Sequence, residues 1–393
     1  MGSFTFMEAV VSKNIVICCD GTGNEYGDRN SNVVNLYRAL SLDDEKQVAY
    51  YHPGVGTEGS PTSRNRLEAA FSVVMGLGFG EGLLRYVGDA YRFLMNGYKE
   101  GDRIYLFGFS RGAYTVRALA GMIHMYGLLH VGNEGMIPYI LKMYARHTRT
   151  ADGMLPTLKE AEGFKSTYSR SPKLHVVGVW DTVSSVGIIW DPLKLPYTAQ
   201  NPSMTHGVHA LSIDERRCFF RNNLWGAALP KKLDEEQQTI HQVWFAGVHS
   251  DIGGSYPSAD SGLSQITLEW MMCEVVKFGL LVDPQRVLMI LGRFPPPPPV
   301  PPDSAQPIHQ SLKWNWWPLE IVPRRVYDWT TKTKKWTIPL GSSRVIPPGS
   351  VIHASVAQKL EMDETYSPRN LPDGWKDYVE PWLRCEFAED PSS

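Results

Sequence analysis

A serine between two glycines is the residue of this chain best suited to nucleophilic chemistry. Ser110 lies in the sequence GFSRGAY, residues 108–114, which follows the mostly apolar run 103–107 and begins a helical pattern. A strand, a sharp turn and a helix in this order form the context of a nucleophile elbow. Gly108 and Gly112 fit that interpretation, because strand and helix approach so closely there that a side chain would clash. We therefore expect an exposed serine hydroxyl beyond the end of a strand.

A serine nucleophile needs a histidine to take its proton and an acid to orient that histidine, and the chain offers two pairs in the required order. In the first pair Asp181 is the acid and His249 is the base; in the second, Asp251 is the acid and His353 is the base. We prefer the first pair, because His249 directly follows an apolar run and precedes two glycines that allow close approach of backbone and substrate. His353 follows Pro-Pro-Gly, a surface turn, and is equally well explained as a structural histidine.

A loop of acidic and small residues, DGTGN, follows the first apolar run. Such residues can shape an oxyanion loop, cap the next helix or bind a substrate hydroxyl. The amide of Arg111, directly after the serine, is a further candidate oxyanion donor, and its guanidinium faces either an anionic group of the substrate or a neighbouring carboxylate. The loop residues concerned are Asp20, Gly21, Thr22 and Asn24.

These candidates stand at the ends of short apolar runs, which occupy residues 15–19, 47–51, 104–107, 174–179 and 243–248. Helical patterns lie between several of the runs, at 32–40 and 83–98. Buried strands that alternate with helices predict the α/β class, with a mostly parallel sheet covered by helices on both faces. Ligands of such sheets bind beyond the carboxyl ends of the strands. Here those ends carry Asp20, Ser110, Asp181, His249 and Asp251.

Two segments look like additions to this core, and we expect both to be caps or inserts within one α/β-hydrolase-like domain, residues 1–393. Residues 127–171 are mixed and mostly helical. Residues 285–345 contain a proline run at 295–302, which can be neither helix nor inner strand, and then an aromatic, basic stretch. The tryptophans of that stretch suit an interface or a substrate lid; they are Trp314, Trp316, Trp317, Trp329 and Trp336.

The composition of the chain indicates which kinds of partner it can bind. The chain has 393 residues, enough for a large core, and 39 basic residues against 41 acidic ones give a net charge of -2. This balance excludes an electrostatic footprint for nucleic acid. The apolar, glycine-rich segment 69–84 is short for a bilayer and contains Glu81, so we expect a helix on the sheet and no stable membrane insertion. We expect a small-molecule substrate, and the sequence predicts no particular oligomeric state.

The five cysteines are scattered, without the paired spacing of a zinc site, and indicate free thiols in a reducing, cytoplasmic compartment. The aspartates at strand ends could, with His249, hold a hard cation. No dense ligand motif accompanies them, so we predict neither a metal nor a cofactor.

Four motifs in a fixed order give the chain a family resemblance. They are CDGTGN at 19–24, GFSRGA at 108–113, GVWDTV at 178–183 and GVHSDIGG at 247–254. With them the chain resembles an α/β-hydrolase family of uncharacterised proteins that includes the catalytic domains of bacterial type VI secretion phospholipase effectors and many fungal proteins. The resemblance extends from about residue 13 to 256. Residues 353–356 and 366–372 also resemble members of this family.

The resemblance implies a Ser110, Asp181, His249 triad and the hydrolysis of esters or phospholipids. Because the chain has no long C-terminal membrane-binding portion like that of the effectors, we expect a soluble small-molecule substrate before a bilayer. Fungal members of such families can serve secondary metabolism, and this suggests an alternative, an epoxide hydrolase or cyclase acting on a polyketide-like compound. There Asp20, Asp181 or Asp251 would attack carbon or activate water, and the serine would only donate a hydrogen bond.

Overall fold

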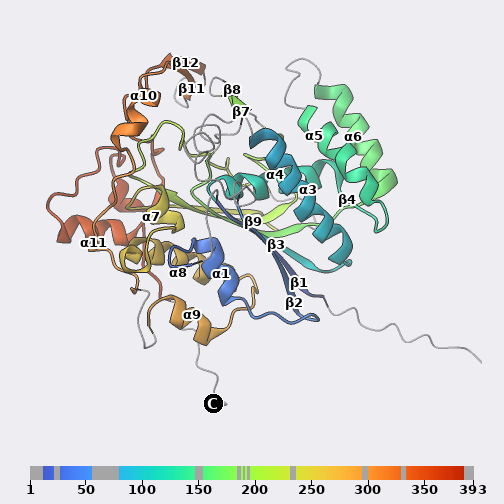
Figure 1. Cartoon of the computed structure of the whole chain (residues 1–393), viewed down its shortest axis with the longest axis horizontal. Coiled ribbons are helices and arrows are strands. Elements are labelled where there is room, and N and C mark those ends of the chain that lie inside the picture. The colour runs from blue at the N-terminus through green and yellow to red at the C-terminus, as the bar shows by residue number, and fades with distance from the viewer. Residues whose placement is uncertain are drawn as a thin grey trace, which may run out of the picture.

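The computed structural model describes residues 12–21, 27–54, 79–146, 154–183, 187–188, 191–192, 195–230, 236–293, 300–328 and 333–384. At its centre is an eight-stranded sheet in the order β14-β13-β10-β9-β6-β3-β1-β2, in which every neighbouring pair is parallel (Figure 1). The strands are β1 (Asn14–Cys19), β2 (Gln47–His52), β3 (Arg103–Phe109), β6 (Leu174–Trp180), β9 (Met204–Ser212), β10 (Thr239–Phe245), β13 (Val351–His353) and β14 (Val379–Glu380). The predicted α/β class with a mostly parallel sheet is confirmed.

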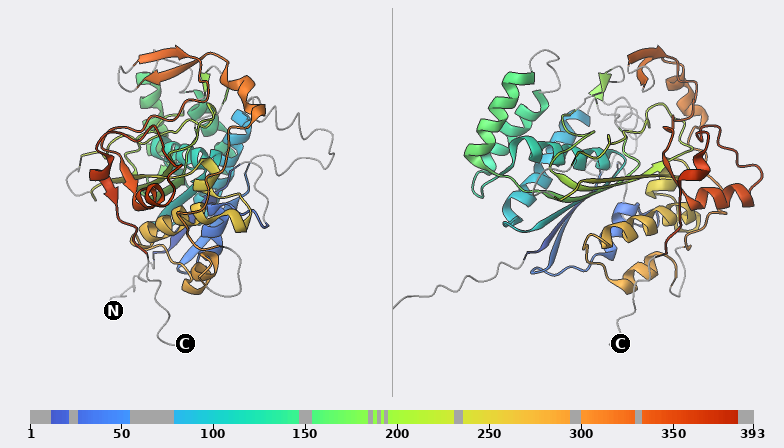
Figure 2. Two further views of the ribbon diagram at one scale, coloured as in Figure 1. Left: turned by 90° about the vertical axis from the view of Figure 1, so that its left-hand side faces the viewer. Right: turned by 180° about the vertical axis from the view of Figure 1, so that it is seen from behind.

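Helices cover both faces of the sheet, and the alternation of side chains along β1 shows how (Figure 2). Ile15 and Ile17 belong to one core cluster, whereas Val16 and Cys18 belong to the other. The helices on the first side are α3 (Phe79–Gly97), α4 (Arg111–Tyr126), α5 (Ile137–Arg146) and α6 (Met154–Tyr168). Those on the second are α1 (Asn32–Ala39), α7 (His249–Gly253), α8 (Gly262–Val276) and α9 (Pro284–Ile290).

Each of the five apolar runs contributes to a strand of the sheet, but the sequence did not reveal β9. β9 is buried along its whole length, yet histidines at positions 206 and 209 interrupt its apolar pattern. β10 also ends earlier than predicted, at Phe245, so that residues 246–248 form the turn into α7. This turn directs His249 back over the sheet edge.

The two segments that the sequence predicts as inserts occupy different sides of the core. The first contains α5, α6 and the short elements β4 (Leu128–Leu129), η1 (Glu134–Met136) and β5 (Ser169–Arg170). Its residues Ile137 and Ile140 join the α3–α4 core cluster, and Figure 1 shows α5 and α6 beside those helices. The second insert contains the end of α9, then η3 (Trp314–Trp316), α10 (Trp317–Glu320), β11 (Arg324–Asp328) and β12 (Thr333–Thr337). Both ribbon figures place the β11–β12 hairpin near β7 (Gly187–Ile188) and β8 (Asp191–Pro192).

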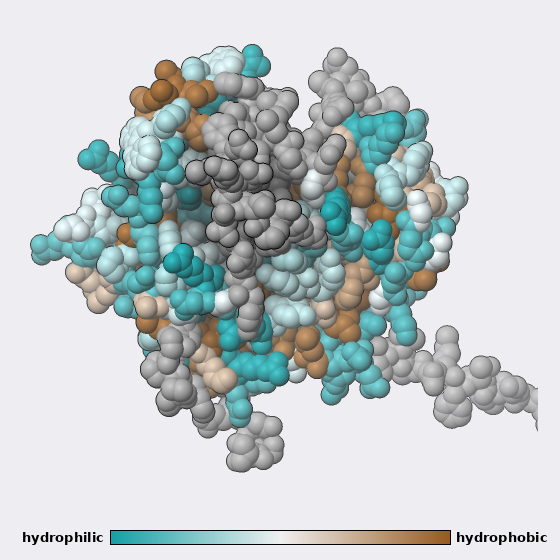
Figure 3. Space-filling view, in the orientation of Figure 1, coloured by the Kyte–Doolittle hydropathy of each residue, from teal (hydrophilic) through white to brown (hydrophobic). Residues whose placement is uncertain are grey.

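Three further elements complete the chain: η2 (Ser258–Asp260), α11 (Ala354–Met362) and η4 (Trp375–Tyr378). Most of the proline run, Trp329 and most of the 69–84 segment lie outside the described residues. Within the described part of the chain, no helix is both long and apolar enough to cross a membrane. Figure 3 shows apolar residues on the surface over α10 and the β11–β12 hairpin, where Ile321 and Ile338 are exposed.

The prediction of free thiols holds for Cys18, Cys19 and Cys218, which are free and buried. It is wrong for Cys273, which is disulfide-bonded. Cys273 lies in α8 with its Sγ 3.7 Å from the Leu383 carbonyl oxygen. The two segments are 110 residues apart, and the spacing of the cysteines does not predict that they meet.

Candidate active site

Ser110 occupies a strained turn between β3 and α4. Its backbone has φ 58° and ψ −120°, a conformation that side-chain-bearing residues rarely adopt. A Cβ on Gly108 would lie 2.6 Å from the backbone of Gly112, and a Cβ on Gly112 would overlap the carbonyl oxygen of Cys19. The predicted clash at both glycines is therefore confirmed. The turn packs against the first residues of α4 and the end of β1.

The structure brings together the preferred set of three residues, from the carboxyl ends of β3, β6 and β10. The Ser110 Oγ lies 2.7 Å from His249 Nε2, and His249 Nδ1 lies 2.5 Å from Asp181 Oδ2. All three residues are buried, so the expectation of an exposed serine is wrong: the turn and the aromatic rings around His249 cover Ser110. Because a carboxylate only accepts, the imidazole donates from Nδ1 to Asp181, and its Nε2 is left to accept from the serine hydroxyl. This is the tautomer that a general base needs.

Two aromatic rings hold the His249 imidazole in place. The Phe109 ring centroid lies 4.7 Å from that of His249, and the Phe220 ring centroid lies 4.8 Å from it. Phe109 has space only because residue 253 is glycine: a Cβ on Gly253 would overlap the phenyl ring. Burial lowers the pKa of His249 below its ordinary value of 6.5, against the opposing effect of Asp181. The imidazole is thus neutral at pH 7 and able to accept a proton.

Asp181 is held by a cation, Arg344, that no sequence motif predicts. Arg344 Nη1 donates to Asp181 Oδ1 at 2.5 Å, and its Nη2 donates to Oδ2 at 2.9 Å. The amide of Ser212 donates to Oδ1 at 3.1 Å. Burial acts to raise the pKa of Asp181, but the Arg344 guanidinium and the His249 imidazole together hold it well below its ordinary value. Asp181 therefore remains a carboxylate although it is fully buried.

A second unpredicted residue, the acid Glu215, supports the backbone of His249. Its Oε2 accepts from the amide of His249 at 3.2 Å, and its Oε1 accepts from the Ser311 hydroxyl at 3.0 Å. Burial acts to raise the pKa of Glu215, but hydrogen bonds and charge from Arg217 lower it to about 2. Glu215 follows β9, and recognising β9 as a strand would have placed Glu215 among the polar residues at strand ends. Arg344 has no local signal at all.

Asp20, directly after β1, accepts hydrogen bonds from side chains that hold the fold together. Its Oδ2 accepts from the Ser31 hydroxyl at 2.6 Å and from the Tyr51 hydroxyl at 2.9 Å. Ser31 is itself the N-cap of α1, so the helix-cap role is the one of the three expected roles that this geometry supports. The amide of Gly21 donates to Asp20 Oδ1 at 2.6 Å and is thus engaged away from an oxyanion. Thr22 and Asn24 lie outside the described residues.

Arg111 is the first residue of α4, where helix amides have no acceptor within the helix. Its amide therefore has the location that an oxyanion donor after the nucleophile requires. Its side chain is half-buried, and burial lowers the pKa of the guanidinium to about 10. The side chain consequently stays positively charged at neutral pH.

The alternative pair is not formed, because Asp251 and His353 are bonded elsewhere. Asp251 Oδ2 accepts from the Val248 amide at 2.9 Å, and Asp251 Oδ1 lies 2.6 Å from His309 Nδ1. His353 is the N-cap of α11, where its Nδ1 accepts from the Ser355 amide at 3.2 Å. Burial lowers the pKa of His353 to about 4. Asp251 thus caps the first turn of α7 from position N3, and His353 is the N-cap of α11.

Comparison with known proteins gives matches over the same part of the chain. Residues 13–274 match the family model described as T6SS, phospholipase effector Tle1-like, catalytic domain. An uncharacterised protein of Saccharomyces cerevisiae, YEL023C, is 38% identical over 219 residues, which are 53% of this chain and 32% of the yeast protein. The chain thus spans about a third of that relative's length.

Two solved structures are also similar. One is an uncharacterised protein from Pseudomonas aeruginosa, with a TM-score of 0.42 and 20% identity, covering 73% of this chain and 49% of the other. The second is the Tle1 effector bound to the VgrG spike of the type 6 secretion system, with a TM-score of 0.33 and 19% identity, covering 64% of this chain and 53% of the other.

Proposed function

Because the chain belongs to the family of T6SS phospholipase effector Tle1-like catalytic domains, we propose that it is a serine hydrolase that cleaves carboxylic esters. The observation that carries the proposal is the continuous relay from the Ser110 hydroxyl through His249 to Asp181, with heavy-atom separations of 2.7 and 2.5 Å. Such a relay supplies a nucleophile, a base and an orienting acid in one arrangement.

In the proposed reaction, His249 Nε2 takes the hydroxyl proton while Ser110 Oγ attacks the ester carbonyl carbon. Asp181 stabilises the imidazolium that forms. The Arg111 amide, at the positive end of the α4 dipole, stabilises the negative charge on the former carbonyl oxygen. The imidazolium then gives its proton to the leaving alcohol, and an acyl-enzyme remains. Water, activated by the same imidazole, releases the acid and restores the serine.

The surroundings of the base favour an apolar acyl group. Phe220, which lies against His249, makes an edge-to-face contact with Trp316 at 5.6 Å between ring centroids. Trp316 is the last residue of η3, and Trp314, the first residue of the same turn, is 85% accessible to solvent. We propose that this aromatic path contacts the acyl chain of a lipid or lipid-like ester. Replacing Trp316 with alanine should then raise KM for long-chain esters and leave KM for acetyl esters nearly unchanged.

Hydrogen bonding of the other aspartates favours ester hydrolysis over epoxide opening. Asp20 accepts from Ser31, Tyr51 and Gly21, and Asp251 accepts from the turn before α7. A carboxylate already saturated by donors is a weak nucleophile toward carbon. We therefore assign both residues to support of the fold.

A serine-directed fluorophosphonate tests the proposal directly. Wild-type protein should be labelled at Ser110, and the Ser110→Ala variant should not. Ser250→Ala is the matched control, since Ser250 neighbours His249 in the sequence but takes no part in the relay. Unchanged labelling of Ser110→Ala, or full activity of that variant, would exclude the acyl-enzyme mechanism.

A further inference from the structure

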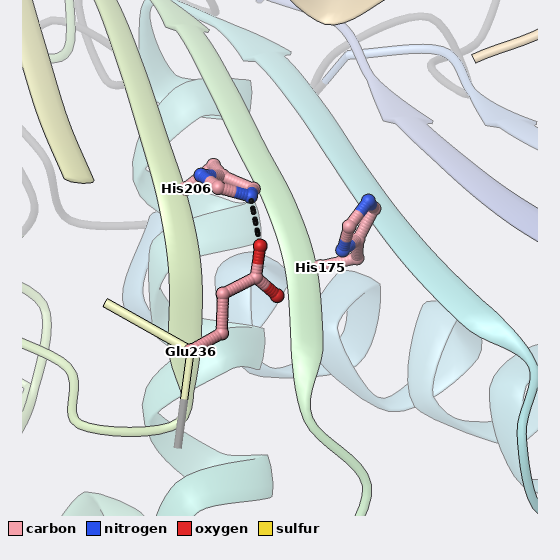
Figure 4. Close-up of side chains that lie close together, drawn as sticks. All are labelled: His175, His206 and Glu236. Carbon is pink, nitrogen blue, oxygen red and sulfur yellow. Dashed lines mark ion pairs between the residues drawn. The ribbon is translucent and has the colours of Figure 1, made fainter. Parts of the chain in front are cut away.

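A cluster of two histidines and one glutamate lies near the amino ends of the central strands β6 and β9 (Figure 4), whereas the relay lies at the carboxyl ends. His175 is the second residue of β6 and His206 is the third residue of β9, so both stand near the amino ends of adjacent strands. Glu236 lies just before β10. We propose that His175, His206 and Glu236 form a binding site for a zinc ion, separate from the ester-hydrolysing site.

The donor set is one that zinc prefers, and the atoms are close enough to share an ion. One ligand atom from each residue lies within 4.8 Å of the others, and His206 Nε2 is 3.3 Å from Glu236 Oε1. Zinc binds histidine nitrogen and carboxylate oxygen at about 2.0–2.2 Å, so tetrahedral ligand atoms are roughly 3.4 Å apart. Glu236 can supply the small inward movement, because 62% of its side chain is exposed. Three protein ligands leave a fourth position for water.

Hydrogen bonds from outside the cluster orient both imidazoles for metal binding. His175 Nε2 lies 2.9 Å from the Phe278 carbonyl oxygen, and since a carbonyl only accepts, the proton is on Nε2 and the lone pair on Nδ1. His206 Nδ1 lies 2.8 Å from the Thr239 hydroxyl, which leaves Nε2 toward Glu236. Ligating histidines in proteins are held by such partners on the other ring nitrogen.

Packing fixes the same rings. The Phe278 ring stacks on His206 with 3.8 Å between centroids and an interplanar angle of 12°. The Tyr105 hydroxyl donates to the Phe278 carbonyl at 2.8 Å, so the acceptor that holds His175 is itself fixed.

A second cluster, of one histidine and two glutamates, lacks these features and serves as a control. His241 lies between Glu274 and Glu380, with its ring nitrogens 3.2 and 2.6 Å from carboxylate oxygens. Burial acts to lower the pKa of His241, but the two carboxylates raise it to about 9. This imidazole is thus protonated at pH 7 and forms ion pairs, leaving no lone pair for a metal.

The test measures zinc binding directly, with chelator-treated full-length protein and a chromophoric zinc indicator as competitor. Wild type should bind one Zn²⁺ per chain, and Glu236→Gln and His175→Gln should each weaken binding at least about tenfold. Glu274→Gln, the control in the second cluster, should bind like wild type. Circular dichroism of each variant verifies folding.

Cobalt provides an independent readout of the ligand set. Co²⁺-loaded wild type should show visible d–d absorption without the near-ultraviolet thiolate band that cysteine ligation gives, and Glu236→Gln should lose the visible bands. The proposal fails if wild type takes up no stoichiometric zinc, if folded Glu236→Gln binds as tightly as wild type, or if Glu274→Gln loses binding to the same extent. None of these readouts depends on ester hydrolysis.

Discussion

The guanidinium of Arg344 contacts both carboxylate oxygens of Asp181, at 2.5 and 2.9 Å, across 163 residues of sequence. Only 1% of the Arg344 side chain and none of that of Asp181 is accessible to solvent. A lone buried carboxylate would take up a proton and lose its charge. The acid beside His249 therefore keeps its charge through a residue from the second insert, beyond the region that matches the family model.

Removal of this cation should impair both stability and turnover. Arg344→Met leaves the Asp181 charge buried with fewer partners, so we expect the free energy of unfolding to fall by about 3–5 kcal/mol. We also expect lower kcat, because a protonated Asp181 stabilises the imidazolium poorly. Urea unfolding and ester turnover measure the two effects. Arg325→Met is the control, since Arg325 is exposed and its cation–π contact with Trp336 is worth at most about 1 kcal/mol. Equal losses in the two variants would contradict the assignment.

The relay residues should differ in the size of their effects. Ser110→Ala removes the nucleophile, and we expect kcat to fall by at least about 10⁴-fold. Asp181→Asn leaves Ser110 and His249 in place but favours the wrong imidazole tautomer, so we expect a loss of about 10³–10⁴-fold. Combining the two changes should cost little more than Ser110→Ala alone. Multiplicative losses in the double variant would show that the residues do not act as one unit.

Activity should depend on pH through a neutral His249. Its pKa lies below 6.5, so kcat/KM should rise through an inflection below about pH 6.5 and then reach a plateau. Asp181, with its strongly lowered pKa, should not titrate in this range. The measurement is kcat/KM against pH with an ester that carries no ionisable group. An inflection above pH 7 would mean that another group, or an unburied imidazole, acts as the base.

The ion-paired His241 should make stability fall at alkaline pH. Its pKa is about 9 in the folded protein and 6.5 ordinarily, so the folded state binds more protons between these values. The stabilisation is therefore complete below about pH 6.5 and disappears as the pH rises through about 9. Because 33% of the side chain is exposed, we expect only about 1–2 kcal/mol. Urea unfolding of wild type and His241→Gln at both ends of this range measures the difference, which should narrow at high pH.

A methyl group added at residue 253 should disturb His249 through the Phe109 ring. Gly253→Ala would overlap the Phe109 ring that packs on His249, so we expect a stability loss of about 1–3 kcal/mol and reduced kcat. Gly163→Ala in α6 is the matched control, because its Cβ would meet nothing within 4 Å. Its better helix propensity should raise stability slightly. Thermal unfolding and turnover of both variants check the prediction, and unimpaired Gly253→Ala would show that the ring can yield.

The sequence predicted the parts of the site that local signals encode. The elbow at Ser110 and the turn at His249 each follow a continuous apolar run and are marked by glycines, so motif and strand could be recognised together. β9 could not, because its buried histidines resemble a solvated face, and Glu215 was missed with it. Arg344 follows a turn of glycine and serines and meets Asp181 only through tertiary folding. The same holds for His175 and His206, which adjacent strands of the sheet bring together.

The location of Arg344 also bears on how the protein can be divided. A fragment cut at residue 274, where the family match stops, would retain Ser110, His249 and Asp181 but not Arg344, the counter-ion of Asp181. It would also lose β13 and β14 and leave β10 as a bare edge prone to self-association. Expression of the matched segment alone should therefore yield an insoluble and inactive product, whereas a boundary after residue 385 retains Arg344, β13 and β14.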